Sequence, residues 1–253
     1  MAKKIRIESE IAPASTGFRS QGMIAGDILF TAGQVGTDMI EPGEMAENTE
    51  DMGEAVRITL SHLEKVTLAA GLGRDDVFEV SAFPRVTGQK DLIYTETNKF
   101  LGAELDLFSY QEVGDVAAHS LLEMDWMAVA NDDLSKEEAT KLVKPLGTSQ
   151  RLEIIDSGPF LIMNRLQGNG ENLGAASEAL LEGLKTELHA RDLSMDSLIK
   201  MTVYIYAFDP YPLFNEVTQR YFADIAPPAR SVLVAPEVTG DAKISIDLIA
   251  IKA

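Results

Sequence analysis

Two spacings of apolar residues alternate along the first half of the chain, and they predict strands and helices in turn. Residues 27–35 form an apolar run that ends at a glycine and a glutamine, typical of a buried strand with close backbone approach at its end. Residues 49–70 place apolar side chains on one stripe of a helix, and residues 76–83 predict the next strand. A second helix over 90–101 and a strand over 120–128 complete the series.

The same series of elements returns in the second half, after a polar and charged stretch over residues 131–147. Asp209-Pro210 is expected to start the last helix, because aspartate is a good N-cap and proline fits the first helical position. The expected elements are strands over 159–165, 200–208, 227–234 and 243–250, and helices over 174–190 and 209–222.

The two halves can be registered against each other at a nearly constant offset. The pairs are Val77 with Leu198 and Leu92 with Leu213 at an offset of 121, Asp125 with Asp247 at 122, and Leu29 with Leu161 at 132. The larger offset at the first strand follows from a polar insert over residues 36–47 of the first half. This agreement indicates a tandem duplication.

We therefore predict an α+β fold built from two repeats, each a mixed β-sheet with two helices packed on one face. The first repeat is expected to span residues 1–131 and the second residues 148–253. Residues 132–147 are expected to be a linker with about one helical turn.

Composition excludes several classes of protein. A net charge of −18 over 253 residues argues against a nucleic-acid-backbone binder, and an anionic ligand would need local arginines. No apolar run is long enough to span a membrane, and no apolar segment follows the N-terminal charges as in a signal peptide. The absence of cysteine favours a cytoplasmic protein, and the three histidines lack metal-ligand spacing, so neither a metal nor a cofactor is expected.

The stretch Pro227-Pro228-Ala229-Arg230-Ser231 holds an arginine at the mouth of a strand, behind a stiff proline lead-in. A guanidinium held in this way is suited to gripping a carboxylate with two parallel hydrogen bonds. The alternative is an ordinary surface arginine beside a turn.

These segments resemble the RidA (YjgF) family of enamine/imine deaminases. Pro228-Ala229-Arg230-Ser231 resembles the family's Pro-Ala-Arg-Ser, and 17–21 resembles its Gly-Pro-Tyr-Ser-Gln. Phe30-Thr31-Ala32-Gly33-Gln34 resembles its Ser-Gly-Gln strand end, Asn215 stands at the start of its second helix, and Asp247 stands where it usually has glutamate. The resemblance implies a chorismate-mutase-like fold and a trimer with ligand clefts between neighbouring units.

The departures from the family are complementary in the two halves. The first half keeps Ala32-Gly33 but has no arginine in the loop 108–113, and Tyr94 replaces the helix asparagine. The second half keeps Arg230 and has Arg165 where the glycine stood. The resemblance thus implies one composite site, although decay of one copy after duplication is the alternative.

By the resemblance, Arg230 would bind the substrate carboxylate together with the backbone N–H of Ser231, and Asp247 would hold or activate the attacking water. Ala32 and Gly33 would form the opposite wall. Asp247 has alternatives as a structural ion pair with Lys243 or Arg230.

The resemblance implies a hydrolase that releases ammonia from an enamine or imine carboxylate, with a small-molecule substrate, no nucleic acid or membrane partner, and a homotrimer. Arg19 and Arg165 at cleft positions favour a dicarboxylate such as 2-aminomuconate. The alternatives are a non-catalytic or chaperone-like ligand-binding member, a chorismatase-like enzyme, and a ribonuclease, which the net charge of −18 disfavours.

Overall fold

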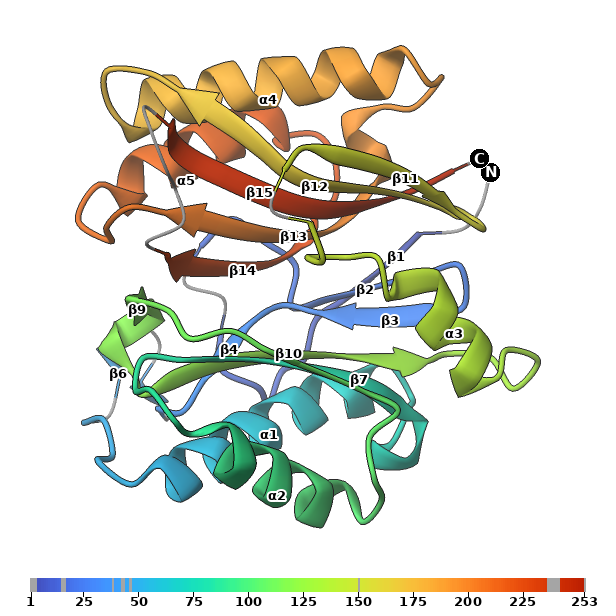
Figure 1. Cartoon of the computed structure of the whole chain (residues 1–253), viewed down its shortest axis with the longest axis vertical. Helices are drawn as coiled ribbons and strands as arrows, with labels where there is room; N and C mark the ends of the chain where they lie inside the picture. The colour runs from blue at the N-terminus through green and yellow to red at the C-terminus, as the bar shows by residue number, and fades with distance from the viewer. Residues whose placement is uncertain are drawn as a thin grey trace.

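The computed structural model describes residues 4–14, 17–37, 39–41, 44–45, 47–149, 151–235 and 242–252. It has two β-sheets packed face to face with helices on both outer sides, as Figure 1 shows. The α+β fold with two repeats, each a mixed sheet with helices on one face, is confirmed. Most of the insert 36–47 lies outside the described residues or is described in its backbone alone.

Sheet A belongs to the first repeat and follows the order β1-β2-β3-β10-β7-β8, with β4 also paired to β10. Its strands are β1 (Ile5–Ile7), β2 (Gly22–Ala25), β3 (Ile28–Thr31), β4 (Gln34–Val35), β7 (Val77–Pro84), β8 (Leu107–Tyr110) and β10 (Leu122–Val129). Helices α1 (Met52–Ala69) and α2 (Lys90–Leu101) cover its outer face, and β5 (Met39–Glu41) pairs with β6 (Glu44–Met45) in the insert.

Sheet B follows the order β11-β12-β15-β13-β14-β9. Its strands are β11 (Glu153–Ser157), β12 (Phe160–Asn169), β13 (Leu198–Ile205), β14 (Ala229–Val234) and β15 (Ala242–Ile251), joined at one edge by β9 (Asp115–Val116) of the first repeat. Helices α4 (Leu173–His189) and α5 (Tyr211–Tyr221) cover its outer face, and short 3-10 turns occupy Arg74–Asp76, Ala117–His119 and Met195–Ser197.

The register of the strands bears out the repeat alignment. Ala128 of β10 pairs with Leu29 of β3, and Ala250 of β15 pairs with Leu161 of β12 at the equivalent place. In both repeats the strand before the second helix pairs in parallel with the strand after it, β7 with β8 and β13 with β14. The two copies therefore share one topology.

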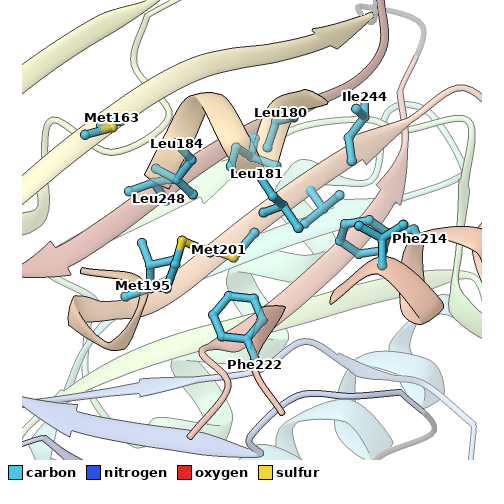
Figure 2. Close-up of a cluster of buried hydrophobic side chains, with 14 of the residues drawn as sticks. Met163, Leu180, Leu181, Leu184, Met195, Met201, Phe214, Phe222, Ile244 and Leu248 are labelled. Atoms are coloured by element: carbon cyan, nitrogen blue, oxygen red, sulfur yellow. The ribbon is translucent and has the colours of Figure 1, made fainter. Parts of the chain in front are cut away.

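Each sheet has an apolar core under its own helices, and a third core lies between the sheets. Figure 2 shows the core of the second repeat, where Leu180, Leu181 and Leu184 of α4 meet Met201 and Leu248 of sheet B. In the shared core, Phe30 of β3 packs edge-on against Phe160 of β12 with ring centroids 5.6 Å apart. This burial between the sheets holds the two repeats in a fixed relation.

Three expectations about local structure differ from what is found. The linker holds a full helix, α3 (Lys136–Val143), which Ser135 begins with a capping box to Glu138. The expected loop 108–113 contains most of β8, because its residues Phe108 and Ser109 pair with β7. Helix α5 begins at Tyr211 instead of at Pro210, since Phe208 and Tyr211 first close a turn by a backbone hydrogen bond.

Candidate functional site between the repeats

The start of β14 and the two prolines before it are hydrogen-bonded to the first repeat; we call this line of contacts the seam. Gly33 N donates to Arg230 O at 3.2 Å, Ser20 N donates to Pro228 O at 3.3 Å, and Ser20 Oγ donates to Pro227 O at 2.6 Å. Proline lacks an N–H and fixes an extended lead-in, so residues 227 and 228 offer only carbonyl groups to the neighbour. The seam therefore brings the glycine wall of the first repeat against the main chain at Arg230.

The guanidinium of Arg230 is buried and anchored on helix α5. Its Nη2 donates to Tyr211 Oη and to Asn215 Oδ1, each at 2.8 Å, and its Nη1 donates to Thr218 Oγ1 at 3.4 Å. Burial lowers the pKa of Arg230, with Tyr211 acting in the opposite direction. Its Nε has no hydrogen-bond partner among the described residues.

Gly17 covers this guanidinium from the first repeat. A Cβ at residue 17 would lie 2.8 Å from Arg230 Nη2 and 2.8 Å from Tyr211 Oη, so only glycine fits there without displacement. Asn215, which the resemblance implies to be a substrate-binding residue, lies next to Arg230. Its role in this structure is to hold the arginine.

An aromatic pair takes the place of the arginine–asparagine pair in the first repeat. Phe108 pairs with Val80 in β7 as Arg230 pairs with Met201 in β13. The ring centroid of Phe108 lies 5.2 Å from that of Tyr94, which registers with Asn215. The first copy therefore replaced a polar anchor by an apolar contact.

A cavity of about 250 Å³ lies beside the seam on the side of the first repeat. Its lining includes Pro13, Arg19, Gly33, Gln34, Thr37 and His62. Arg19 also donates from Nη1 to Arg230 O at 3.1 Å, so this cation joins the cavity wall to the seam. His62, buried on α1, was considered in the sequence only as a metal ligand.

Ala32 and Ser231 are directed away from this cavity. Ala32 belongs to the core between the sheets, next to Gly33. The Ser231 hydroxyl bonds to Asp125, whose Oδ2 lies 2.7 Å from Lys200 Nζ, and Lys200 also donates to Thr31 O at 2.7 Å. Both charged side chains of this pair are 2% exposed. Asp125 is thus a structural carboxylate at the contact of the sheets.

Glu123 of β10 is the site residue that the sequence analysis missed. Its carboxyl fills the space that a side chain at residue 33 would occupy, and its Oε1 accepts from Val232 N at 3.3 Å across the seam. Its Oε2 is buried without a hydrogen-bond partner among the described residues. Burial raises the pKa of Glu123 to about 7, while the nearby Arg19 acts to lower it.

A signal for Glu123 was present in the sequence. Residues 123 and 125 alternate onto the same face of one strand, and both are acids. Only Asp125 stands out in the repeat alignment, because it has an acidic counterpart in the second repeat, Asp247, whereas Glu123 registers with Ser245.

Asp247 and Arg230 were expected to act in one site, but they point to opposite faces of sheet B, so this expectation is wrong. Thr202 of β13 is opposite both Ser231 and Asp247, whereas Met201 is opposite Arg230. Because side chains alternate along a strand, Asp247 points between the sheets and Arg230 points toward the helices. Asp247 accepts from Arg165 N at 2.7 Å and from Tyr204 Oη at 3.1 Å.

Arg165 is likewise absent from the lining of the cavity beside Arg19. Its guanidinium lies 4.5 Å from the ring centroid of Tyr204, and its Nε donates to Ser149 O at 3.3 Å and lies 4.0 Å from Asp247 Oδ1. Its backbone has a φ of 55°, in the left-handed region, whereas Gly33 at the equivalent position of the first repeat is not among the residues with positive φ. Arg165 was expected to bind substrate in the same cleft as Arg230, and the structure shows that this expectation is wrong.

Within the described ranges, no group of three or more histidine, aspartate or glutamate side chains is placed to hold a metal ion. In the same residues, no helix combines the length and the apolar character that crossing a bilayer requires.

Comparison with known proteins relates the second repeat to a family. A family profile described as Endoribonuclease L-PSP matches residues 162–252. A RutC family protein of Buchnera aphidicola is 25% identical over 116 residues, covering 44% of this chain and 92% of that protein. The Escherichia coli protein described as "Putative reactive intermediate deaminase TdcF" is 32% identical over 81 residues, covering 32% of this chain and 59% of that protein.

Among solved structures, Escherichia coli TdcF with bound serine aligns at a TM-score of 0.44 and 24% identity, covering 50% of this chain and 99% of that one. A putative endoribonuclease L-PSP of Entamoeba histolytica aligns at a TM-score of 0.45 and 18% identity, with the same coverage of both chains. Residues 162–252 therefore form a domain of the endoribonuclease L-PSP family, also called the RidA family.

Proposed function

We propose that this protein is a cofactor-free hydrolytic deaminase, which releases ammonia from an enamine or imine that bears a carboxylate. The observation that carries the proposal is that Arg19 and Gly33 line the cavity beside the seam, while the buried carboxyl of Glu123 lies directly against Gly33. A relative whose description names a reactive intermediate deaminase supports the same chemistry.

Arg19 is assigned the first contact with the substrate carboxylate, since its side chain lines the cavity. A guanidinium and a carboxylate form charge-assisted hydrogen bonds, which offset the repulsion of a chain with net charge −18. Arg230 does not line this cavity, and Gly17 lies against its guanidinium. A direct contact between Arg230 and a carboxylate, as expected from the sequence, would require Gly17 to move away from the guanidinium.

Glu123 is assigned the role of general base. A carboxyl with a pKa of about 7 is both ionised and protonated at neutral pH, which suits transfer of a proton in both directions. In the proposed reaction the imine is protonated on nitrogen, and water loses a proton to Glu123 as its oxygen adds to the imine carbon. As the C–N bond of the resulting carbinolamine breaks, Glu123 returns its proton to the departing nitrogen and the hydroxyl group releases its proton to water, so that a keto acid and ammonia result.

The test is ammonia release from a panel of enamine carboxylates, including 2-aminomuconate. We expect Glu123→Gln to lose activity by about 100-fold or more, as general-base catalysis commonly contributes that much. Glu138→Gln, which changes an exposed carboxyl on α3, is the matched control and should retain the activity of the parent.

Two outcomes would replace the proposal. Saturable binding of the panel without ammonia release would favour the non-catalytic ligand-binding alternative. Equal activity of Glu123→Gln and the parent would exclude Glu123 as the base.

The preference for a dicarboxylate is a finer proposal that rests on Arg19 and Arg230. Arg165 packs on Tyr204 and does not line the cavity, so Arg165→Ala should treat mono- and dicarboxylate substrates as the parent does. Arg19→Ala should lower kcat/KM for both classes, because Arg19 makes the first contact with a carboxylate, whereas Arg230→Ala should lower it more for dicarboxylates. If Arg230→Ala lowers both classes equally, the preference for two carboxylates is not set at this site.

A further inference from the structure

A second cavity, of about 260 Å³, lies between the two sheets, lined by residues of β7 and β8 of sheet A, of β13 and β15 of sheet B, and of the end of α3. Its polar lining includes two carboxylates and four hydroxyl groups, from Glu79, Ser81, Ser109, Thr202, Tyr204 and Asp247. The cavity is distinct from the one beside Arg19, with which it shares none of its lining residues. Neither the proposed deaminase nor its assigned residues use it.

Glu79 is the feature of this cavity that calls for a ligand. Its side chain is 2% exposed, and Ser81 Oγ donates to its Oε1 at 2.8 Å. Its Oε2 is buried and has no hydrogen-bond partner among the described residues. A buried carboxyl oxygen without a partner is costly, so a donor supplied from outside would be favoured here.

The contact between the sheets that is equivalent under the repeat alignment shows which donor stands at this place. Glu79 registers with Lys200, and Asp247 registers with Asp125. Lys200 and Asp125 are in contact: the Lys200 ammonium lies 2.7 Å from Asp125 Oδ2, and it also donates to Ser231 Oγ at 3.3 Å. In the cavity Glu79 stands in place of the lysine, so two acids, Glu79 and Asp247, line it together, whereas Asp125 pairs with an ammonium group.

We propose that the cavity between the sheets is a binding site for a small primary ammonium ion. The ion would take the place, beside Asp247, that the Lys200 ammonium occupies beside Asp125. The expected acceptors are Glu79 Oε2, the carboxylate of Asp247 and the hydroxyl of Ser109, which registers with Ser231. An ammonium group has three N–H donors and suits such a set of oxygens.

The charges around the site are consistent with a single small cation. Glu79 faces Asp125 of β10 and Lys200 of β13, while Lys144 after α3 lines the mouth of the cavity. Arg165 partly neutralises Asp247, with its Nε 4.0 Å from Oδ1. Burial and the nearby Asp125 raise the pKa of Glu79 to about 8, against the hydrogen bonds of Ser81 and Ser109 and the charge of Lys200, which act to lower it, so an arriving cation displaces the proton of this carboxyl.

The test uses methylammonium chloride as the probe on the intact chain, followed by the shifts of backbone amide signals in two-dimensional NMR. We expect saturable shifts at Ser81, Ser109 and Gly147, with a dissociation constant in roughly the millimolar range typical of a very small ligand. Sodium chloride at equal ionic strength and ethanol, a neutral molecule of similar size, should give no saturable shift at these residues.

Two variants and two controls separate this site from others. Glu79→Gln should weaken methylammonium binding by about tenfold or more, because it removes one charged acceptor. Ser109→Leu, which fills the cavity from β8, should abolish binding even if Glu79→Gln fails to fold. Glu138→Gln on the surface and Glu123→Gln in the other cavity should bind as the parent does.

Shifts that do not saturate, or that persist equally in Glu79→Gln and Ser109→Leu, would mean that methylammonium is only a general counterion of an acidic protein. Since Glu123→Gln is expected to lose deaminase activity and to keep methylammonium binding, failure of this proposal and failure of the proposed function are distinguishable.

Discussion

The sharpest test of the site is Gly33→Ala, which adds one methyl group at the seam. A Cβ at residue 33 would lie 2.5 Å from Cδ of Glu123 and 2.9 Å from its Cγ, whereas ordinary contact begins at 3.4 Å. The carboxyl of Glu123 must therefore retreat by about 1 Å, and its side chain is only 1% exposed. The backbone is not the obstacle, because Gly33 is absent from the residues with positive φ.

Two effects of different size follow from this displacement. Overpacking of an enclosed position costs roughly 1–3 kcal/mol in the free energy of unfolding. Misplacement of a catalytic group by about 1 Å lowers the rate by about 100-fold. We expect Gly33→Ala to show both losses, measured by urea unfolding and by kcat/KM for ammonia release.

The double variant Gly33→Ala/Glu123→Ala identifies the cause. Removing the carboxyl relieves the clash, so the alanine at residue 33 should cost little stability in a Glu123→Ala background, although activity stays lost. Gly183→Ala is the matched control, because nothing lies within 4 Å of the added methyl group on the exposed face of α4. It should stabilise the fold by about 0.5–1 kcal/mol. Equal costs of Gly33→Ala with and without Glu123 would refute the steric argument.

Three further predictions concern charge and assembly. Lys200→Met should cost about 3–5 kcal/mol of stability by leaving Asp125 buried without its ammonium partner, and Asp125→Leu in the same chain should recover much of that loss in urea unfolding. The kcat/KM for ammonia release should rise with pH through about 7 as Glu123 ionises, and a profile without that limb would count against Glu123 as the base. The homotrimer expected from the sequence stays a prediction; because the two sheets already cover each other, other surfaces must hold it, and light scattering that shows a stable monomer at micromolar concentration would contradict it.

The repeat architecture was predictable from the sequence because it depends on local signals. Helix stripes, N-caps and alternating strands each involve a few neighbouring residues, and the second helix of the first repeat spans 90–101 as expected. The offset of Leu29 and Leu161 also carried information about pairing, since both lie opposite equivalent alanines of the last strands.

The geometry of the candidate site was less predictable, because it depends on register between strands far apart in the sequence. Whether Asp247 shares a face with Arg230 is decided by how β15 and β14 each pair with β13. The pairing of β13 with β15 includes an irregularity between Leu198 and Lys200, and a shift of one residue exchanges the two faces. Glu123 was missed for a related reason, since only the packed structure brings its carboxyl under Gly33.

The pH dependence of stability tests the second cavity independently of any ligand. Burial raises the pKa of Glu79 from its ordinary value of 4.5 to about 8. Below pH 4.5 the folded and unfolded states both hold the proton, whereas between pH 4.5 and about 8 only the folded state retains it. The folded state then binds more protons, so its stability falls as pH rises through this window and levels off above it.

Each unit of pKa displacement corresponds to about 1.4 kcal/mol in the free energy of unfolding. Since Glu79→Gln has no carboxyl to ionise, its free energy of unfolding should rise progressively relative to that of the parent across this window. Glu123→Gln is the matched comparison. Because the pKa of Glu123 is raised only to about 7, the gain in stability of this variant over the parent should level off at a lower pH. Urea unfolding at a series of pH values measures both curves. A constant difference between Glu79→Gln and the parent would show that the Glu79 carboxyl is hydrated in the folded state, and a hydrated carboxyl would have no need of the ammonium ion that we place there.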